Sequence, residues 1–341
     1  METRMKAELI KTTKQGTKVF AIENDFGMRA EVLSYGAIVS KLLVKDKNGN
    51  LVDVVAGYED EDEFRTDTCY FNAFIGRVCN RIENGRFTLD GKEYVLAKND
   101  GVNHLHGGMR GFDKREYTAE IVGAASVKFS RVSPSGEEGY PGALAVSVTY
   151  TVTNDNALEI TYEATSDMTT VCSLTNHAYF NLDGDFESVL GHELFINSDA
   201  LTDIDEGLIP HGELLALKGT PYDFSTPKKI GRDIKANDRL LNVARGYDFN
   251  YVLKGDVKDV KATAVAENSG IKLDVFTDRP CIQLYTGNFL DGVKGKKTYG
   301  YQSAFCLETQ GYPNAVNVPT FESVVLKAEQ IFCIFARKRT G

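Results

Sequence analysis

The sequence lacks several features that define whole classes of protein. It has no tryptophan and, in 341 residues, only 8 prolines and 6 cysteines. The cysteines are Cys69, Cys79, Cys172, Cys281, Cys306 and Cys333. They form no C-x-x-C pair and no dense spacing, which disfavours a zinc site or a disulfide framework, so we expect reduced thiols. No stretch approaches the roughly 18 apolar residues of a membrane span. We also find no apolar core of signal-peptide length and no N-x-S/T sequon, and therefore expect a cytoplasmic protein.

The formal net charge of -9 argues against two kinds of partner. Nucleic-acid phosphates and anionic membranes both attract basic surfaces, so neither is expected to bind this chain. The sequence carries no signal for an oligomeric state.

Cofactor-binding motifs are also missing. We find no P-loop, no G-x-S-x-G elbow, no H-E-x-x-H and no dinucleotide fingerprint. The remaining chemistry is that of His, Glu, Asp, Arg and Asn without a cofactor. That inventory fits acid/base catalysis on a neutral polar ligand, with aromatic faces against rings and amides on hydroxyls.

Alternation of apolar and polar residues with period two predicts a fold made of strands. Residues 146–152 and 158–164 alternate in this way around Asn154-Asp155-Asn156 and predict an antiparallel hairpin. A second hairpin is indicated by Asp90-Gly91 between residues 86–89 and 92–96, because a type I′ turn needs residues that tolerate positive φ.

The rest of the chain supports the same fold class. Further strands are expected at residues 30–44, 52–58, 126–132, 271–277, 281–286, 303–309 and 322–336. The best helical signal is a short stretch near residues 233–241. No linker or repeat divides the chain. We therefore predict an all-β protein, a large antiparallel β-sandwich with few short helices, as one domain over residues 1–341.

A histidine in an unusual setting is the strongest candidate for chemistry. His177 lies within residues 172–182, CSLTNHAYFNL, among amides, hydroxyls and aromatic rings. Histidine has an ordinary pKa of about 6.5 and transfers protons near neutrality, and a half-buried site can adjust that value. The sequence predicts a proton-transfer group that needs a partner.

Two more histidines occur in the polar segment 99–108. His104 and His106 share one face if the segment is extended, an arrangement that a metal site of the cupin kind uses. The signal is weak, because no third ligand lies nearby in the sequence. The alternative is that one histidine ties down the glycine-rich turn while the other faces a pocket.

Other polar side chains lie in apolar surroundings. Arg77, Asn80 and Arg81 offer donors for hydroxyl or carboxylate oxygens, or form ion pairs with acidic residues. Asp248 lies between aromatic residues, and Glu308 lies near the end of an apolar strand. Burial of a carboxylate is costly without partners, so each is either structurally paired or functional.

Taken together, these motifs resemble the aldose 1-epimerase (galactose mutarotase) family. The matching pieces, in the order of the family, are GRVCNRI at 76–82, NHLHGG at 103–108 with GFDK at 111–114, TNHAYFNL at 175–182, Tyr247-Asp248, QLYTGN at 283–288 and LETQ at 307–310. They span most of the chain, about residues 34 to 335. One departure is Tyr117, close to where many relatives carry a tryptophan.

The resemblance implies a mutarotase-like supersandwich with an open cleft for a hexopyranose such as galactose or glucose. By the family pattern Glu308 is the general base and His177 the general acid. The residues implied to line the sugar site are Asn80, Arg81, His106, Tyr179, Asp248 and Gln283. No metal, nucleotide or redox group is implied.

The chemistry of the implied reaction is consistent with these groups. Exchange of α and β anomers requires removal of the C1 hydroxyl proton, protonation of ring oxygen O5 and cleavage of the C1–O5 bond, followed by rotation and reclosure. We expect Glu308 to be ionised near its ordinary pKa, and His177 to need a raised pKa, helped by Asp248. Two alternatives are a hexose-6-phosphate 1-epimerase, which needs extra cationic side chains, and a non-catalytic carbohydrate-binding β-sandwich.

Overall fold

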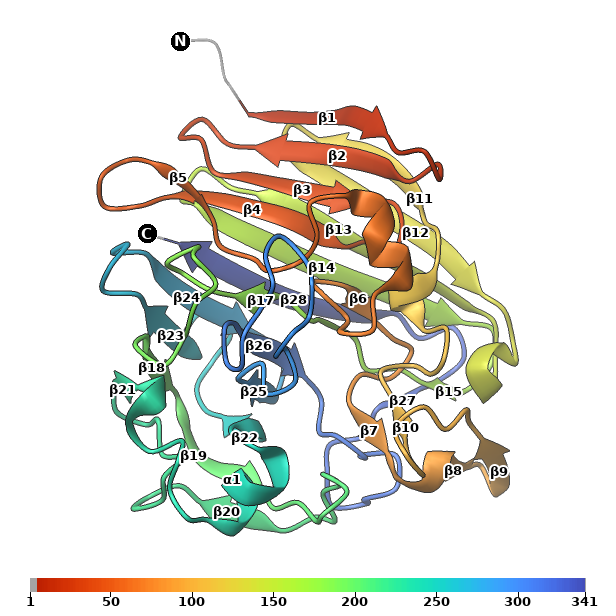
Figure 1. Cartoon of the computed structure of the whole chain (residues 1–341). Coiled ribbons are helices and arrows are strands. Elements are labelled where there is room, and N and C mark those ends of the chain that lie inside the picture. The colour runs from red at the N-terminus through yellow and green to blue at the C-terminus, as the bar shows by residue number, and fades with distance from the viewer. Residues whose placement is uncertain (1–4, 341) are drawn as a thin grey trace.

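Three antiparallel sheets contain most of the strands in the computed structural model, which describes residues 5–340 (Figure 1). The largest has the spatial order β11 (Thr118–Gly123), β12 (Ser126–Ser133), β13 (Leu144–Val152), β14 (Ala157–Ser166), β28 (Phe332–Thr340), β24 (Lys272–Thr277), β23 (Ala262–Val265), β18 (Glu193–Ile196) and β21 (Lys228–Lys229). The second follows the chain through β1 (Lys6–Thr12), β2 (Lys18–Glu23), β3 (Arg29–Leu33), β4 (Val39–Lys45) and β5 (Leu51–Asp53). The third has the order β17 (Tyr179–Phe180), β26 (Phe305–Gln310), β25 (Cys281–Tyr285), β22 (Asp248–Leu253), β19 (Ser198–Thr202) and β20 (Leu214–Ala216).

Short strand pairs join the loops around these sheets. They are β10 (His104–Leu105) with β7 (Arg81–Ile82), β16 (Thr175–Asn176) with β6 (Phe74–Ile75), β15 (Thr170–Val171) with β27 (Val325–Leu326), and β8 (Arg86–Leu89) with β9 (Lys92–Val95). Short 3-10 turns lie at Glu61–Thr66, Glu83–Gly85, Phe112–Lys114, Glu137–Gly139 and Ile230–Arg232. The strand-rich architecture with little helix confirms the predicted fold class.

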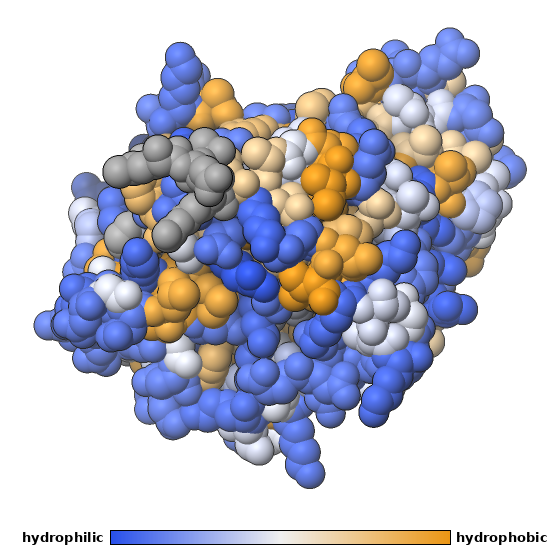
Figure 2. Space-filling view, turned by 90° about the horizontal axis from the view of Figure 1, so that it is seen from above, coloured by the Kyte–Doolittle hydropathy of each residue, from blue (hydrophilic) through white to orange (hydrophobic). Residues whose placement is uncertain are grey.

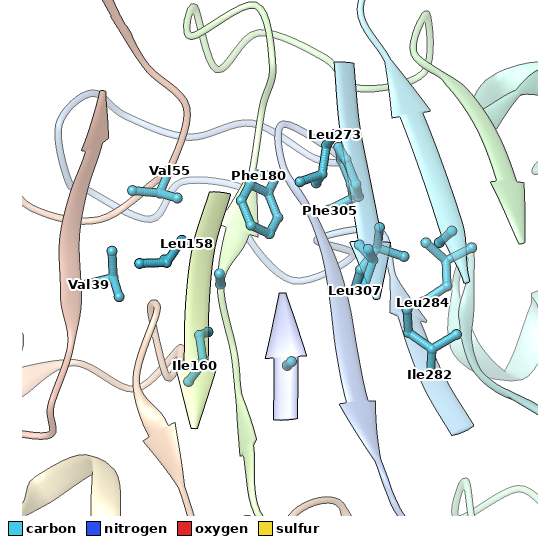
Figure 3. Close-up of a cluster of buried hydrophobic side chains, with 14 of the residues drawn as sticks. Val39, Val55, Leu158, Ile160, Phe180, Leu273, Ile282, Leu284, Phe305 and Leu307 are labelled. Atoms are coloured by element: carbon cyan, nitrogen blue, oxygen red, sulfur yellow. The ribbon is translucent and has the colours of Figure 1, made fainter. Parts of the chain in front are cut away.

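The sheets share one apolar core. Side chains from β2 and β4 of the second sheet, from β13, β14 and β24 of the largest and from β25 and β26 of the third belong to the same buried cluster. Figure 3 shows part of it, with Phe180 between Leu158 of β14 and Leu273 of β24. Because strand residues alternate between faces, the other face of β25 and β26 is free to carry polar groups.

Both predicted hairpins are confirmed. In the first, β13 pairs with β14 in continuous antiparallel register. In the second, Leu89 pairs with Lys92, and the two residues between them, Asp90 and Gly91, have φ of 50° and 76° as a type I′ turn requires. Predicted strands at 126–132, 271–277, 281–286 and 303–309 correspond to β12, β24, β25 and β26.

Three strand predictions were wrong in extent. The run 30–44 is two strands, because Gly36 and Ala37 adopt φ of 63° and 44° and form a turn between β3 and β4. The run 322–336 contains a gap between β27 and β28, and β28 continues to Thr340. Of residues 52–58 only the first two are in a strand, β5.

The one α-helix within residues 5–340 is α1 (Arg239–Ala244), which overlaps the end of the predicted stretch near 233–241 and continues beyond it. The side chain of Asp238 accepts hydrogen bonds from the backbone N–H groups of Leu240 and Leu241, and this cap fixes where the helix begins. In the described chain, no helix has the length and apolar character needed to cross a membrane.

The surface that carries the N-terminal strands is mixed in character. Figure 2, seen from above relative to Figure 1, shows apolar side chains in small groups separated by hydrophilic ones. Apart from the part covered by grey residues, no broad apolar patch is visible on this face of the described residues. Scattered apolar groups of this kind are normal for a protein surface.

Candidate active site

A cavity of about 170 Å³ opens at the face of β25 and β26 that points away from the core. Pockets for drug-sized ligands hold about 300–1,000 Å³, so this one suits a single small ring. All eight predicted site residues line it: Asn80, Arg81, His106, His177, Tyr179, Asp248, Gln283 and Glu308. Residues that are far apart in the sequence therefore meet in one place.

Glu308 is held rigidly in the wall of the cavity. It lies on the central strand β26, pairs with Gln283 of β25, and is 2% exposed. One of its carboxyl oxygens, Oε2, is buried and has no hydrogen-bond partner within the described chain. An unsatisfied carboxyl oxygen is costly in a folded protein and is available to a ligand hydroxyl.

His177 faces Glu308 across a short gap. Its Nε2 atom lies 3.6 Å from Oε1 of Glu308, and its Nδ1 atom lies 3.6 Å from Sγ of Cys306. The ring stacks on Tyr179, with 5.0 Å between centroids and an angle of 27°. The main chain is fixed as well, because the N–H of His177 donates to the carbonyl of Ala73. The pair is thus positioned by neighbouring strands and aromatic packing.

His106 is oriented by a bond that fixes which ring nitrogen carries hydrogen. The backbone N–H of Asn80 donates to Nδ1 of His106 at 3.1 Å. Burial lowers the pKa of His106 well below its ordinary value, so the ring is neutral and its hydrogen is on Nε2. His106 therefore offers a hydrogen-bond donor to the cavity.

The amide and acid groups opposite form a connected network. Gln283 donates through Nε2 to Oδ1 of Asp248 at 2.6 Å, and Gln310 donates through Nε2 to Oε1 of Gln283 at 3.2 Å. Arg81 donates through Nε to Asp100 at 2.7 Å, and its Nη1 lies 4.0 Å from Oδ2 of Asp248. These bonds fix donors and acceptors for several ligand hydroxyls.

Burial shifts the pKa of both central groups toward the uncharged form. It raises the pKa of Glu308 from 4.5 to about 8, and the charge of Asp248 acts in the same direction. It lowers the pKa of His177 from 6.5 to about 4. The sequence-based expectations, an ordinary pKa for Glu308 and a raised one for His177, were wrong. Burial removes hydration from both side chains, and the charge of Asp248 raises the pKa of Glu308 rather than that of His177.

The H-x-H segment does not form a metal site by itself. His104 is bound at Nδ1 to the carbonyl of Ala97 (2.6 Å) and at Nε2 to the hydroxyl of Tyr140 (2.7 Å). In the part of the chain described, the one cluster with metal-ligand spacing is His106, His177 and Glu308. The hydrogen on Nε2 of His106 occupies the position of the lone pair that a metal needs, so this donor set does not fit a metal well.

Two other residues from the sequence analysis lie outside the site. Arg77 is buried and donates to the carbonyl oxygens of Ser133 and Pro141, so its role is structural. Tyr117 does not line the cavity; its hydroxyl donates to the carbonyl of Phe112 in the core. The departure from tryptophan at this place therefore affects packing away from the ligand.

The cavity includes residues that the sequence reasoning missed. They are Thr68, Cys69, Tyr70, Leu105, Tyr285, Phe289 and Leu290. Tyr285 stands within the QLYTGN motif, so its position carried a signal. Tyr70 has none, because it lies in a loop and reaches the site through a positive φ of 61°.

Comparisons with known proteins identify the family to which the chain is similar. The family model described as Aldose 1-epimerase matches residues 18–332. Galactose mutarotase of Sus scrofa is 46% identical over 313 residues, covering 90% of this chain and 89% of its own. Aldose 1-epimerase of Escherichia coli K12 is 36% identical over 309 residues, with 89% of each chain covered. The crystal structure of a GalM/aldose epimerase homologue from C. elegans superposes with a TM-score of 0.90 at 34% identity, covering 96% of this chain and 99% of its own.

This chain belongs to the aldose 1-epimerase family. The family and the enzyme class predicted from the sequence, an isomerase acting as an aldose 1-epimerase, are thereby confirmed.

Proposed function

We propose that this protein interconverts the α and β anomers of a hexopyranose, galactose or glucose, with Glu308 and His177 as the proton-transfer pair. The observation that carries the proposal is the 3.6 Å approach of Nε2 of His177 to Oε1 of Glu308 in the wall of a small cavity lined by both polar and aromatic side chains. Amide and acid groups for hydroxyl binding surround the pair, and Tyr179 supplies an aromatic wall, with its own hydroxyl donating to the carbonyl of Cys69.

The reaction needs one base and one acid at the same time. Glu308 takes the proton of the C1 hydroxyl while His177 gives a proton to O5, and the C1–O5 bond breaks to leave the open aldehyde. Rotation about C1–C2 and reclosure then form the other anomer, and the two residues exchange roles as the protons return. The pair begins and ends the cycle with the same number of protons.

The free site holds that proton on Glu308, because burial favours a neutral carboxyl and a neutral imidazole. A bound sugar changes the balance. Its C1 hydroxyl donates to the unpartnered carboxyl oxygen and stabilises the carboxylate, and O5 accepts from a protonated His177. Substrate binding therefore favours transfer of the proton from Glu308 to His177, which produces the carboxylate base and the protonated histidine that the reaction needs.

Galactose or glucose is a better fit than a phosphorylated hexose. Among described residues, Arg81 is the one lysine or arginine that lines the cavity, and it is already bound to Asp100. A phosphate would face uncompensated carboxyl groups there. A direct comparison of galactose, glucose and glucose 6-phosphate should show the phosphate ester to be the poorest substrate.

Polarimetry on freshly dissolved α-galactose tests the assigned roles. Glu308→Gln and His177→Asn should each lower the catalysed rate by about 10²–10⁴-fold while the proteins stay folded. Exposed residues supply matched controls: Glu322→Gln and His211→Asn make the same chemical changes and should keep wild-type rates. Near wild-type activity in either site variant would reject the role given to that residue. Sugar binding without mutarotation by the wild type would favour the binding-module alternative.

The proposal also covers the domain organisation and the cellular location of the protein. We propose a single domain over residues 1–341, supported by a core that takes residues from Phe20 to Ala336; residues 1–4 and 341 lie outside the described part. We also propose a cytoplasmic location, supported by six cysteines that are all free thiols.

A further inference from the structure

Strand β28 directs a lysine into the apolar core. Ile334, Ala336 and Lys338 alternate on its inner face and are 1%, 1% and 2% exposed. The ammonium group of Lys338 is buried and has no hydrogen-bond partner within the described chain. Buried lysines are normally paired, since an isolated ammonium in an apolar medium loses its hydration without compensation.

The surroundings of Lys338 are apolar. Its cross-strand neighbours are Leu158 of β14 and Val275 of β24, both in the main core. Its Nζ atom lies 4.8 Å from the ring centroid of Phe180, an arrangement in which the aromatic face partly compensates the charge. Figure 3 shows Phe180 in the middle of this cluster, between the largest sheet and β26.

The catalytic pair lies on the opposite side of the same two strands. Phe180 of β17 pairs with Phe305 of β26, and Tyr179 pairs with Cys306. Strand alternation therefore directs Phe180 and Phe305 to the core and Tyr179, Cys306 and Glu308 to the opposite face, where Tyr179 and Glu308 line the cavity. Lys338 stands behind the β17–β26 ladder whose front carries Glu308.

The ionisable groups within electrostatic range of Lys338 are few. Those that act on it are Cys306 and Glu308 of β26, and its charge acts in turn on His177. The charges of Asp248 and Arg81, which lie on the cavity side, also act on the pKa of Glu308. Lys338 lowers the pKa of both Glu308 and His177, whereas Asp248 raises that of Glu308.

We propose that Lys338 is a positioning residue for the reaction: its buried ammonium acts through the β17–β26 ladder to favour the carboxylate form of Glu308. This inference rests on the proposed function of the His177–Glu308 pair. The effect that matters is the one on the carboxyl group, because without Lys338 the negative charge of Asp248 would hold Glu308 more strongly in its protonated form. This role accounts for a buried ammonium that has no hydrogen-bond partner within the described chain.

The test replaces the charge and follows the protonation of the pair. Lys338→Met keeps an unbranched apolar stem and removes the ammonium. The acid limb of the pH profile of kcat/KM should move to higher pH by on the order of 0.5–1 unit, because the pair loses the field of a nearby cation. The alkaline limb should move in the same direction by less, because the ammonium of Lys338 itself titrates near pH 8. Lys338→Gln, a second neutral variant, should give the same shift if the methionine variant fails to fold.

Lys261→Met is the matched control. Lys261 is also 2% exposed, but its ammonium is bound to the carbonyls of Lys254 and Gly255, and it does not act on the pair. Its removal should lower stability and leave both limbs in place. Unmoved limbs in both neutral variants of Lys338 would overturn the inference.

A second readout separates failure of this inference from failure of the proposed function. In the free protein, the ring ¹⁵N shifts of His177, assigned with His177→Asn, report its titration without any turnover. Lys338→Met should raise that midpoint by the same amount as the acid limb. An unchanged midpoint rejects the role of Lys338, whereas absence of mutarotation in the wild type rejects the function of the pair.

Discussion

The pH dependence of kcat/KM follows directly from the burial of His177 and Glu308. Burial places the pKa of His177 at about 4 and that of Glu308 at about 8, so the free pair holds one proton between these limits. Below about pH 4 the pair gains a second proton and has no base. Above about pH 8 it loses its only proton and has no acid.

The expected profile is a plateau about four pH units wide. Because kcat/KM reports the ionisation of the free enzyme, the rate should be flat from about pH 4 to about pH 8 and fall about tenfold per unit outside that range. At pH 9 it should be about one tenth of the plateau. The two limbs belong to the pair as a whole, since its members interact directly.

Polarimetry with α-galactose well below KM measures this profile. Spontaneous mutarotation is itself accelerated by acid and base, so a blank without enzyme is subtracted at each pH. Circular dichroism at the extremes separates ionisation from unfolding. A limb near pH 6.5, the ordinary value for histidine, would refute the reasoning, because it would mean that His177 is hydrated in the free enzyme.

Two further predictions follow from the same charges. Asp248→Asn removes a charge that raises the pKa of Glu308, so the alkaline limb should move to lower pH, opposite to Lys338→Met; a shift to higher pH would contradict the assignment. The second prediction concerns stability. Burial lowers the pKa of Lys338 from 10.5 to about 8, so below pH 8 the buried ammonium lowers the free energy of unfolding by up to about 3 kcal/mol. The stability of the wild type should therefore rise between pH 8 and 10.5, where the folded state has lost this proton and the unfolded state still holds it. Urea unfolding should therefore show Lys338→Met to be more stable than the wild type at pH 7 and equal to it above about pH 10.5; equal stability at pH 7 would show that the ammonium is hydrated or paired.

Local sequence patterns predicted many of the strands, and the motifs shared with the family predicted part of the cavity lining. The turn at Asp90-Gly91 and the alternation in β13 and β14 are short-range signals, and the structure follows them. The site residues were found through motifs, and the fold brings all eight to one cavity. Element limits failed where a turn interrupts an apolar run, as at Gly36 and Ala37.

Protonation could not be predicted in the same way. His104 and His106 stand two residues apart in one motif, yet one binds Tyr140 and the other faces the cavity. The pKa of Glu308 depends on burial and on Asp248, which is brought close by the pairing of β22, β25 and β26. Nor does the sequence show that Lys338, which lies beyond the end of the predicted strand 322–336, directs its ammonium into the core.

The pKa shifts of Glu308, His177 and Lys338 have the same main cause, which is the loss of hydration on burial. Loss of hydration favours neutral Glu308 and neutral His177 in the free site, so the pair itself presents no charge to a neutral ligand. In the proposed mechanism, the ionic pair needed for ring opening forms when sugar oxygens supply the missing hydrogen bonds. Burial raises the pKa of Glu308 to about 8, Asp248 acts in the same direction and Lys338 in the opposite one, and a value near neutrality suits a group that both takes and gives a proton. A reaction whose two directions are equivalent requires such a value, because a strong acid or a strong base would slow one half of the cycle.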